Sequence, residues 1–400
     1  MRKGWEYKKL GEVTSFFRGL TYSGKDEVDK SNNIVLRSNN IDLSTNSLNF
    51  DELKFISDSI TIPQDKKLRK NSIFMCMSNG SKQHLGKVAF IEKEYPYAFG
   101  GFMGLIVPNE DKLVPKFTYY YFCSQKFKAY LSAIGNGANI NNIKYIDIAK
   151  DSIPLPPLST QLAIVTELDK INELIRLKKE QLKDFDNLAQ SIFYEMFGDP
   201  VENEKGWEVK KLGDCFSYIK NGANIKQTKD VDGFPITRIE TLAGGIFNRD
   251  RMGYAGIYDL SKYSAYVLES RDLLMSHINS KTYIGRTVEY KRNNDETIIH
   301  GMNLLRLKAI HDIIDSTFFV YYTKSGDFKS KIARIRKDAV NQSSFAISDL
   351  KRLNIPLPPL SLQRLFAQRI EQIEHQKAEV QKAIADLETL LASRMQYWFE

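Results

Sequence analysis

One short stretch of the sequence comes close to a motif that binds nucleotide phosphates. Residues 19–25 read GLTYSGK and match the GxxxxGK pattern, in which backbone N–H groups and a lysine surround the phosphates. The next residue is Asp26, where the motif needs Ser or Thr to hold magnesium. The corresponding stretch later in the chain, KNGANIKQTKD (220–230), has no such pattern. Nucleotide binding by this stretch is therefore not expected.

Residue types that commonly bind metals or act as nucleophiles are scattered along the sequence. The five histidines form no HxxxH or HExxH pair, and Cys76, Cys123 and Cys215 form no CxxC pair. The carboxylates form no recognisable nuclease cluster, and no Pro-Pro pair belongs to a DPPY motif of adenine methyltransferases. The sequence therefore predicts no catalytic residue, no metal site and no cofactor held by this chain.

Two loops carry the side chains best suited to binding a polyanion. Residues 78–87 (SNGSKQHLGK) and 278–286 (INSKTYIGR) combine Asn, Lys, Gln, Tyr and Arg, which donate hydrogen bonds to phosphates or base edges. Lys82 and Lys281 suit a phosphate contact. The positions that differ between the loops suit base reading, namely Gln83, His84, Thr282 and Tyr283. Gly86 and Gly285 are expected to supply turn geometry. A solvated hairpin without a ligand is the alternative.

Other polar stretches, at 37–40, 136–142 and 340–344, have a similar composition. The candidate DNA-binding residues are Arg37, Asn39, Asn40, Lys82, Gln83, His84, Lys87, Asn139, Asn141, Arg238, Lys281, Thr282, Tyr283, Arg286, Asn341 and Gln342.

The elements that must position these loops occur twice. The phrase IPLPPLS stands at 153–159 and again at 355–361, 202 positions apart. Three further phrases return in the same order at offsets of 199 to 202: GWExKKLG (4–11 and 206–213), SKxx[LI]G[KR] (81–87 and 280–286) and FxxYYxxSxxFK (117–128 and 318–329). The chain is therefore two copies of one unit of about two hundred residues.

Each copy has two parts of different character. Residues 1–153 and 200–355 consist of short β-branched and aromatic runs broken by Asn, Gly and Ser, with a helical stretch near 117–131. This texture predicts two α+β domains. Residues 154–199 and 356–400 instead predict a spacer helix each, because neither Pro nor Gly occurs from Ser159 to Phe197. The prolines should end the globular part, with Ser159 or Ser361 capping the helix.

Apolar residues in both spacer helices recur at steps of three and four, as in a heptad seam. Lys178 interrupts the first seam, and Lys377 and Arg394 interrupt the second. One face packed on its own domain is the common explanation, but helices of nearly forty residues, roughly 57 Å, outrun a compact domain. We therefore expect the two helices to pair antiparallel. The predicted seam residues are Leu168, Ile171, Ile175, Leu182, Phe185, Ile192, Ile370, Ile373, Val380, Ile384, Leu387 and Leu391.

The excess of positive over negative charge is confined to the globular parts. Residues 1–158 carry a net charge of +6 and residues 199–360 carry +5, whereas the helices 159–198 and 361–400 carry −2 and −1. Two basic domains on a spacer without excess positive charge suit a protein that binds double-stranded DNA at two sites. Basic faces without any partner are the alternative.

Composition and cysteine usage indicate the cellular compartment in which the protein is expected. No run of eighteen apolar residues occurs, and the N-terminal stretch lacks an apolar signal core, so neither a membrane span nor export is expected. Three isolated cysteines fit a reducing, cytoplasmic location.

Taken together, the repeated phrases resemble those of a known family. Two variable halves, each preceded by GWExKKLG and followed by IPLPPLSxQ and a long helix, look like the specificity subunit of a type I restriction–modification system. The resemblance covers the whole chain, including Gln161 and Gln363. It implies two target-recognition domains on an antiparallel helical spacer, each reading one half of a split, asymmetric DNA site.

The resemblance also implies partners. Two modification subunits would use S-adenosylmethionine, and restriction subunits would hydrolyse ATP with magnesium, so that this chain directs methylation and cleavage without catalysing them. Two other functions remain open: a self-contained enzyme that modifies or cleaves DNA, and a coiled-coil scaffold that binds protein.

Overall fold

The computed structural model describes residues 4–81, 84–135, 142–228, 230, 232–340 and 342–400. The chain divides into two compact units: unit 1 is Met1–Lys179 with Lys382–Glu400, and unit 2 is Glu180–Gln381. Each unit therefore holds one globular half of the repeat and one stretch of each long helix. The predicted domain boundaries, which separate globular parts from helices, stay predictions.

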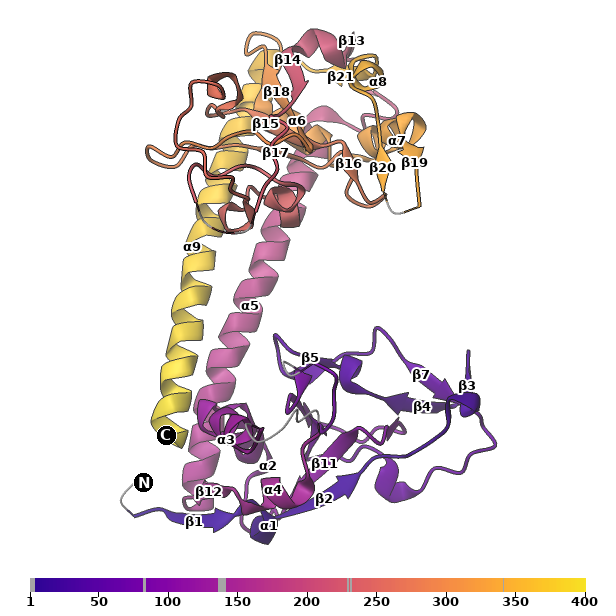
Figure 1. The fold of residues 1–400 in the computed structure, drawn as a ribbon, viewed down its shortest axis with the longest axis vertical. Helices are drawn as coiled ribbons and strands as arrows, with labels where there is room; N and C mark the ends of the chain where they lie inside the picture. Colours follow the sequence, from indigo (N-terminus) through magenta and orange to yellow (C-terminus); the bar gives the residue numbers. More distant parts are fainter. Residues whose placement is uncertain (1–3, 82–83, 136–141, 229, 231, 341) are drawn as a thin grey trace. The chain divides into compact units, whose positions relative to one another are not determined.

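The globular part of unit 1 is built on an antiparallel sheet of order β2-β11-β8-β9. A second sheet of order β10-β4-β7-β3 and the pairs β1-β12 and β5-β6 complete it. Its elements (Figure 1) are β1 Glu6–Lys9, α1 Leu10–Val13, β2 Thr14–Arg18, β3 Glu27–Val28, β4 Asn33–Leu36, β5 Ile41–Asp42, β6 Ser47–Leu48, β7 Lys54–Ile56, β8 Ser72–Cys76, β9 Val88–Ile91, β10 Ala98–Phe99, β11 Met103–Pro108, α2 Pro115–Cys123, α3 Gln125–Gly135, α4 Tyr145–Lys150 and β12 Ser152–Leu155.

Unit 2 repeats the main sheet in the same order, as β14-β18-β15-β17, and repeats the β1-β12 pair as β13-β21. A three-stranded sheet of order β16-β20-β19 is added. Its elements are β13 Glu208–Lys211, β14 Phe216–Asn221, β15 Leu273–Ser276, β16 Ile278–Asn279, β17 Thr287–Glu289, β18 Leu304–Ala309, α6 Ser316–Tyr322, α7 Gly326–Ile335, β19 Lys337–Asp338, β20 Ser343–Ser344, α8 Ile347–Lys351 and β21 Asn354–Leu357.

The central strand of each main sheet is buried on both faces. In β8, Ile73 and Met75 pack in one core with α2, while Phe74 and Cys76 pack in a second core with Phe99. Strands buried on two faces are continuously apolar, so a two-residue alternation cannot reveal them in the sequence. The α+β character predicted for both halves is confirmed.

In each unit, the segments GWExKKLG and IPLPPLS supply the two strands of one small sheet. In unit 1, β1 pairs with β12, which places Tyr7 opposite Pro154; in unit 2, β13 pairs with β21, which places Val209 opposite Pro356. GWExKKLG and IPLPPLS thus close each globular part by pairing its first strand with its last.

The long helices α5 (Leu158–Phe197) and α9 (Leu360–Phe399) contain 40 residues each. The expected serine caps are wrong: the helices begin at Leu158 and Leu360, two residues before the start that a serine cap would give, and the carbonyl groups of Pro157 and Pro359 accept the first helical hydrogen bonds. A proline suits this position because its missing N–H group would have no partner inside the helix. The helix α5 ends at Phe197, directly before Gly198, whose φ is +74°.

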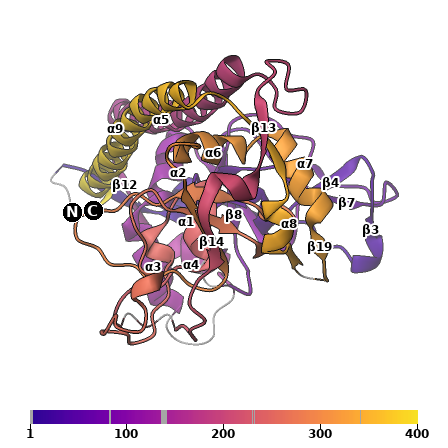
Figure 2. The same cartoon turned by 90° about the horizontal axis from the view of Figure 1, so that it is seen from above.

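Within each unit the two helical stretches run antiparallel, and Figure 2 shows them from a second direction. In unit 1, Lys179 of α5 pairs with Glu388 of α9 at 2.8 Å, while Glu167 pairs with the later residue Arg394. In unit 2, Lys377 pairs with Asp186 at 2.8 Å. Antiparallel pairing of the long helices is confirmed within each unit.

The seam residues of both helices are withdrawn from solvent. Seven of the predicted set are buried, namely Leu168, Ile171, Ile175, Ile370, Ile373, Val380 and Ile384. The other five are partly buried, namely Leu182, Phe185, Ile192, Leu387 and Leu391.

The end of each long helix also belongs to a globular core. Phe399 packs on Phe117 and Tyr121 in unit 1, with ring centroids 5.2 and 6.0 Å apart. Phe197 packs on Phe318 and Phe366 in unit 2, at 4.9 and 5.3 Å. The last apolar residue of each helix thus completes the core of the unit that it enters.

Candidate nucleic-acid interface

The two loops singled out in the sequence close onto the sheet in the same way at their glycines. Each joins two antiparallel neighbours, β8 to β9 in unit 1 and β15 to β17 in unit 2. The N–H groups of Gly86 and Gly285 donate to the carbonyl groups of Cys76 and Ser276 at 2.9 and 2.7 Å. Both glycines have φ near +80°, a conformation that other residue types seldom adopt. Their predicted role in the turn is confirmed.

Two candidates of unit 1 lie in its interior. Asn40 is fully buried; its amide donates to the carbonyl groups of Asn49 and Glu52 and accepts from the N–H of Arg37. Lys87 is 8% exposed, donates to the carbonyl of Ile41 at 2.9 Å, and burial lowers the pKa of its ammonium group. Asn40 thus fixes the 37–40 stretch against residues 49–52, and Lys87 fixes the end of the first loop against Ile41.

The other described candidates of unit 1 lie nearer the surface. Asn39 is exposed and donates to Glu52. Arg37 is half-buried, and its Nε has no hydrogen-bond partner among the described residues. Nδ1 of His84, also half-buried, has none within the same described ranges.

In unit 2 most candidates already have an internal partner. Arg238 pairs with Glu240, and Lys281 pairs with Asp338 at 3.2 Å. The Arg286 guanidinium lies 4.3 Å from the centroid of the Tyr283 ring. Thr282 and Gln342 are exposed.

Five candidates, namely Lys82, Gln83, Asn139, Asn141 and Asn341, lie outside the described residues.

A cavity of ≈ 560 Å³ opens beside the first loop and brings four separate segments together, within 18–27, 37–39, 78–80 and 100–103. Arg37 and Asn39 line it, as predicted candidates, but so do Arg18, Asn79 and Phe102, which sequence reasoning missed. The turn Gly100-Gly101-Phe102 was the available signal. This turn packs directly against Gly19, where a Cβ atom would lie 2.0 Å from the carbonyl oxygen of Gly100, so the contact requires glycine at position 19.

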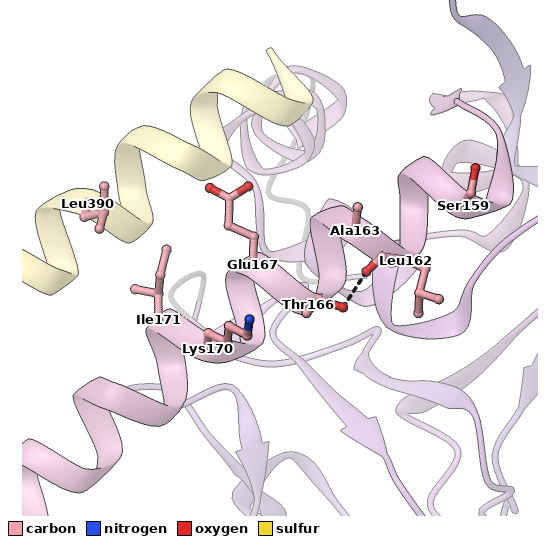
Figure 3. Close-up of a pocket in the computed structure, with 8 residues that line it drawn as sticks. All are labelled: Ser159, Leu162, Ala163, Thr166, Glu167, Lys170, Ile171 and Leu390. Atoms are coloured by element: carbon pink, nitrogen blue, oxygen red, sulfur yellow. Dashed lines mark hydrogen bonds between the residues drawn. The ribbon is translucent and has the colours of Figure 1, made fainter.

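A second cavity, of ≈ 670 Å³, lies along the helix pair of unit 1 (Figure 3). Leu162, Ile171 and Leu390 provide its apolar lining, and Glu167 and Lys170 provide charge. Thr166 donates to the carbonyl of Leu162 at 2.8 Å and so satisfies its hydroxyl within the helix. Leu162 is 56% exposed, so this surface is a shallow apolar groove between α5 and α9.

Among the described residues, no three His, Cys, Asp or Glu side chains are grouped so as to hold a metal ion. None of the described helices is long and apolar enough to cross a membrane.

The comparisons with known proteins agree with this arrangement. The family model for the type I restriction modification DNA specificity domain matches twice, over residues 2–184 and 204–389. The chain is 25% identical to the StySPI specificity subunit of Salmonella potsdam, over 98% of this chain and 87% of the relative. It is 23% identical to the EcoKI specificity subunit of Escherichia coli K12, over 93% of this chain and 82% of the relative.

Solved structures support the fold. A chain of a type I restriction–modification assembly superposes with a TM-score of 0.59 at 20% identity, covering 99% of this chain and 97% of that one. The S subunit of the type I system of M. genitalium gives 0.52 at 15% identity, covering 99% and 96%.

The fold and the repeated loops define a protein with two DNA specificity domains in tandem. The chain belongs to the type I restriction–modification DNA specificity family.

Proposed function

We propose that this chain is the DNA specificity subunit of a type I restriction–modification complex and binds a bipartite, asymmetric double-stranded target. The observation that carries the proposal is that both units have the same main sheet, whereas the side chains on their matched loops differ. In this proposal each unit reads one half-site. Because the loops differ in residue type, with Tyr283 in only one of them, the two half-sites should differ in sequence.

Binding should depend strongly on salt. The net charges of +6 and +5 on the globular parts favour phosphate contacts, and each contact releases counterions from the DNA. A protein scaffold would lack this dependence, which separates the two functions experimentally.

We further propose that this chain catalyses nothing itself and works in the cytoplasm. Two modification subunits would supply S-adenosylmethionine-dependent methylation, and restriction subunits would supply ATP- and magnesium-dependent cleavage. The apolar groove of unit 1 lined by Leu162, Ile171 and Leu390 is a suitable docking surface for a modification subunit. Leu162→Glu should therefore weaken co-purification with that subunit, whereas Leu188→Glu, at another exposed position of α5, is the matched control.

The decisive experiment is a domain swap in the assembled complex. Residues 1–153 are replaced by the corresponding part of another specificity subunit, and methylated positions are mapped on random DNA. One half-site should change, and the other half-site should stay as before. A change in both, or methylation without a bipartite pattern, would contradict the proposal; methylation or cleavage by the purified chain alone would favour the self-contained enzyme.

A further inference from the structure

The side chain of Phe102 projects from unit 1 into solvent. It is 73% exposed, although the residues on either side of it in the same turn are not exposed. Leaving a phenyl ring in water forfeits on the order of 2 kcal/mol relative to burying it. An apolar ring at the mouth of a cavity lined by Arg and Asn is therefore unusual for packing alone.

The backbone that carries this ring is held firmly. The carbonyl of Phe102 accepts from the N–H groups of Met77 and Ser78 at 2.9 and 3.1 Å. The N–H of Met103 donates to Gly100 at 2.8 Å, and Gly100 lies against Gly19 without room for a side chain. The ring thus stands on a fixed turn, which reduces the entropy lost when it meets a ligand.

Hydrogen-bond donors line the same cavity as the ring. Arg18, Arg37, Asn39 and Asn79 line the same cavity, and Arg37 brings a buried Nε without a partner among the described residues. Asn79 is itself positioned, because its amide donates to Ser38 at 3.1 Å and accepts from the N–H of Ser81 at 2.9 Å.

The remaining polar groups of the cavity do not offset these donors. Glu27 forms an ion pair with Lys54, so its negative charge is compensated. Burial raises the pKa of Tyr22, so its phenol is neutral at ordinary pH. The cavity therefore offers neutral and cationic donors together with one apolar ring.

Unit 2 repeats some of these backbone features with different residues: by the matched bridges Leu20–Gly100 and Ala223–Gly301, Met302 aligns with Gly101, one residue before Phe102. Arg238 occupies the position of Arg37: the backbone N–H of each arginine donates to a side-chain oxygen at 2.8 Å, that of Thr241 in unit 2 and that of Asn40 in unit 1. The turn that precedes β18 carries Met302, which is 40% exposed. A Cβ atom at Gly222 would lie 2.2 Å from the carbonyl of His300, as at Gly19 in unit 1.

We propose that the cavity formed by Arg18, Arg37, Asn39, Asn79 and Phe102 is the base-reading site of unit 1, and that Phe102 contacts the C5-methyl group of a thymine in the major groove. The inference rests on the proposed function and specifies how one half-site is read. In the major groove, thymine alone among the four bases presents a methyl group, and the neighbouring O4, O6 and N7 atoms accept hydrogen bonds. A fixed ring among donors matches that pattern.

The test uses the chain assembled with its modification subunits and the bipartite target found by methylation mapping. Each thymine of the first half-site is replaced in turn by deoxyuridine, which removes only the methyl group. One replacement should weaken binding about fourfold, the value for losing one buried methyl contact. With Phe102→Ala, binding to the unmodified target should fall about tenfold, and the same deoxyuridine replacement should have no further effect.

Two variants test whether the effect of Phe102→Ala comes from losing an apolar contact or from disturbing the structure. Phe102→Leu keeps an apolar side chain and should retain the sensitivity to the methyl group. Phe50→Ala removes another partly exposed ring of unit 1, which does not line the cavity, and should leave both affinities unchanged. Met302→Ala should act on the second half-site only.

The outcomes separate the two levels of the proposal. A complex without any bipartite target would overturn the proposed function. A clear target with no deoxyuridine effect in the first half-site, or with the same effect in Phe102→Ala as in the original chain, would overturn the assignment of Phe102 alone.

Discussion

The glutamine of the repeated phrase fastens each long helix to its globular part. Gln161 is fully buried; its Oε1 accepts from the N–H of Val114 at 2.8 Å, and its Nε2 donates to Lys112 and Pro156, both at 2.9 Å. Gln363 does the same in unit 2, accepting from Asp315 at 2.9 Å and donating to Pro358 at 2.8 Å and Ile313 at 3.3 Å. One side chain in each unit thus satisfies three buried backbone groups.

Replacing Gln161 by Leu keeps the volume but removes all three bonds. At about 1 kcal/mol for each hydrogen bond, and with the desolvated groups left unsatisfied, the loss should be about 3 kcal/mol. That is roughly a hundredfold change in the equilibrium between the closed and open states of the unit, at 1.4 kcal/mol for each factor of ten.

Hydrogen exchange read at single amides is the appropriate assay. In Gln161→Leu, the amide of Val114 should lose about a hundredfold of its protection while the amide of Asp315 keeps it; in Gln363→Leu the pattern should be reversed. Gln368→Leu, at an exposed position of α9, is the matched control. If Val114 exchanges at the original rate and unfolding stays within 1 kcal/mol of the original, the assigned role of this glutamine is refuted.

Three further predictions concern acid stability, packing and spacing. His277 and His300 are buried in unit 2, where burial lowers their pKa values to about 4 and about 3. Below about pH 6.5 these histidines bind protons in the unfolded chain but not in the folded one, so each histidine should lower the free energy of unfolding of unit 2 by about 2 kcal/mol at pH 5. Denaturant unfolding measured at a series of pH values checks this. Phe399→Ala should destabilise unit 1, and Phe197→Ala should destabilise unit 2, by about 3–5 kcal/mol in denaturant unfolding, and equal effects of one variant on both units would argue against the packing described. Deleting one heptad from α5 should change the permitted gap between half-sites in methylation mapping and leave both half-sites readable, whereas an unaltered gap would refute a spacer role for the helix.

The features that follow a fixed period or a repeat could be predicted from the sequence. Seam residues such as Leu168 and Ile370 follow a helical period, and Gly86 and Gly285 occur at matched places in a repeated phrase. In each case the physical cause is local: helix geometry fixes which side chains share a face, and a left-handed turn favours glycine. The capping residue was missed because serine is a preferred N-cap, whereas here the helix begins at Leu158 and the carbonyl of Pro157 accepts the first helical hydrogen bonds.

The candidate site depended on contacts between distant segments, which a single sequence does not encode in its periodicity. Asn40 and Lys87 look like surface donors in polar stretches, but tertiary hydrogen bonds to Glu52 and Ile41 draw them inside. Phe102 looks like any core phenylalanine. It is 73% exposed in a turn that begins where Gly19 lies against Gly100, a contact between segments eighty residues apart.

Comparison of the two units distinguishes residues that stabilise the fold from residues that can change without disturbing the fold and so alter which bases are read. Gln161 and Gln363 are the same residue because three backbone groups must be satisfied at once, and no smaller side chain both donates and accepts at that reach. Asn40 and Thr241 differ, yet both supply the single acceptor that their arginine N–H needs. At the turn tip, where Phe102 and Met302 face solvent, the fold constrains only the backbone. A duplicated domain with this division can acquire a second specificity by changing exposed side chains alone, since none of the bonds that fasten the helices passes through them.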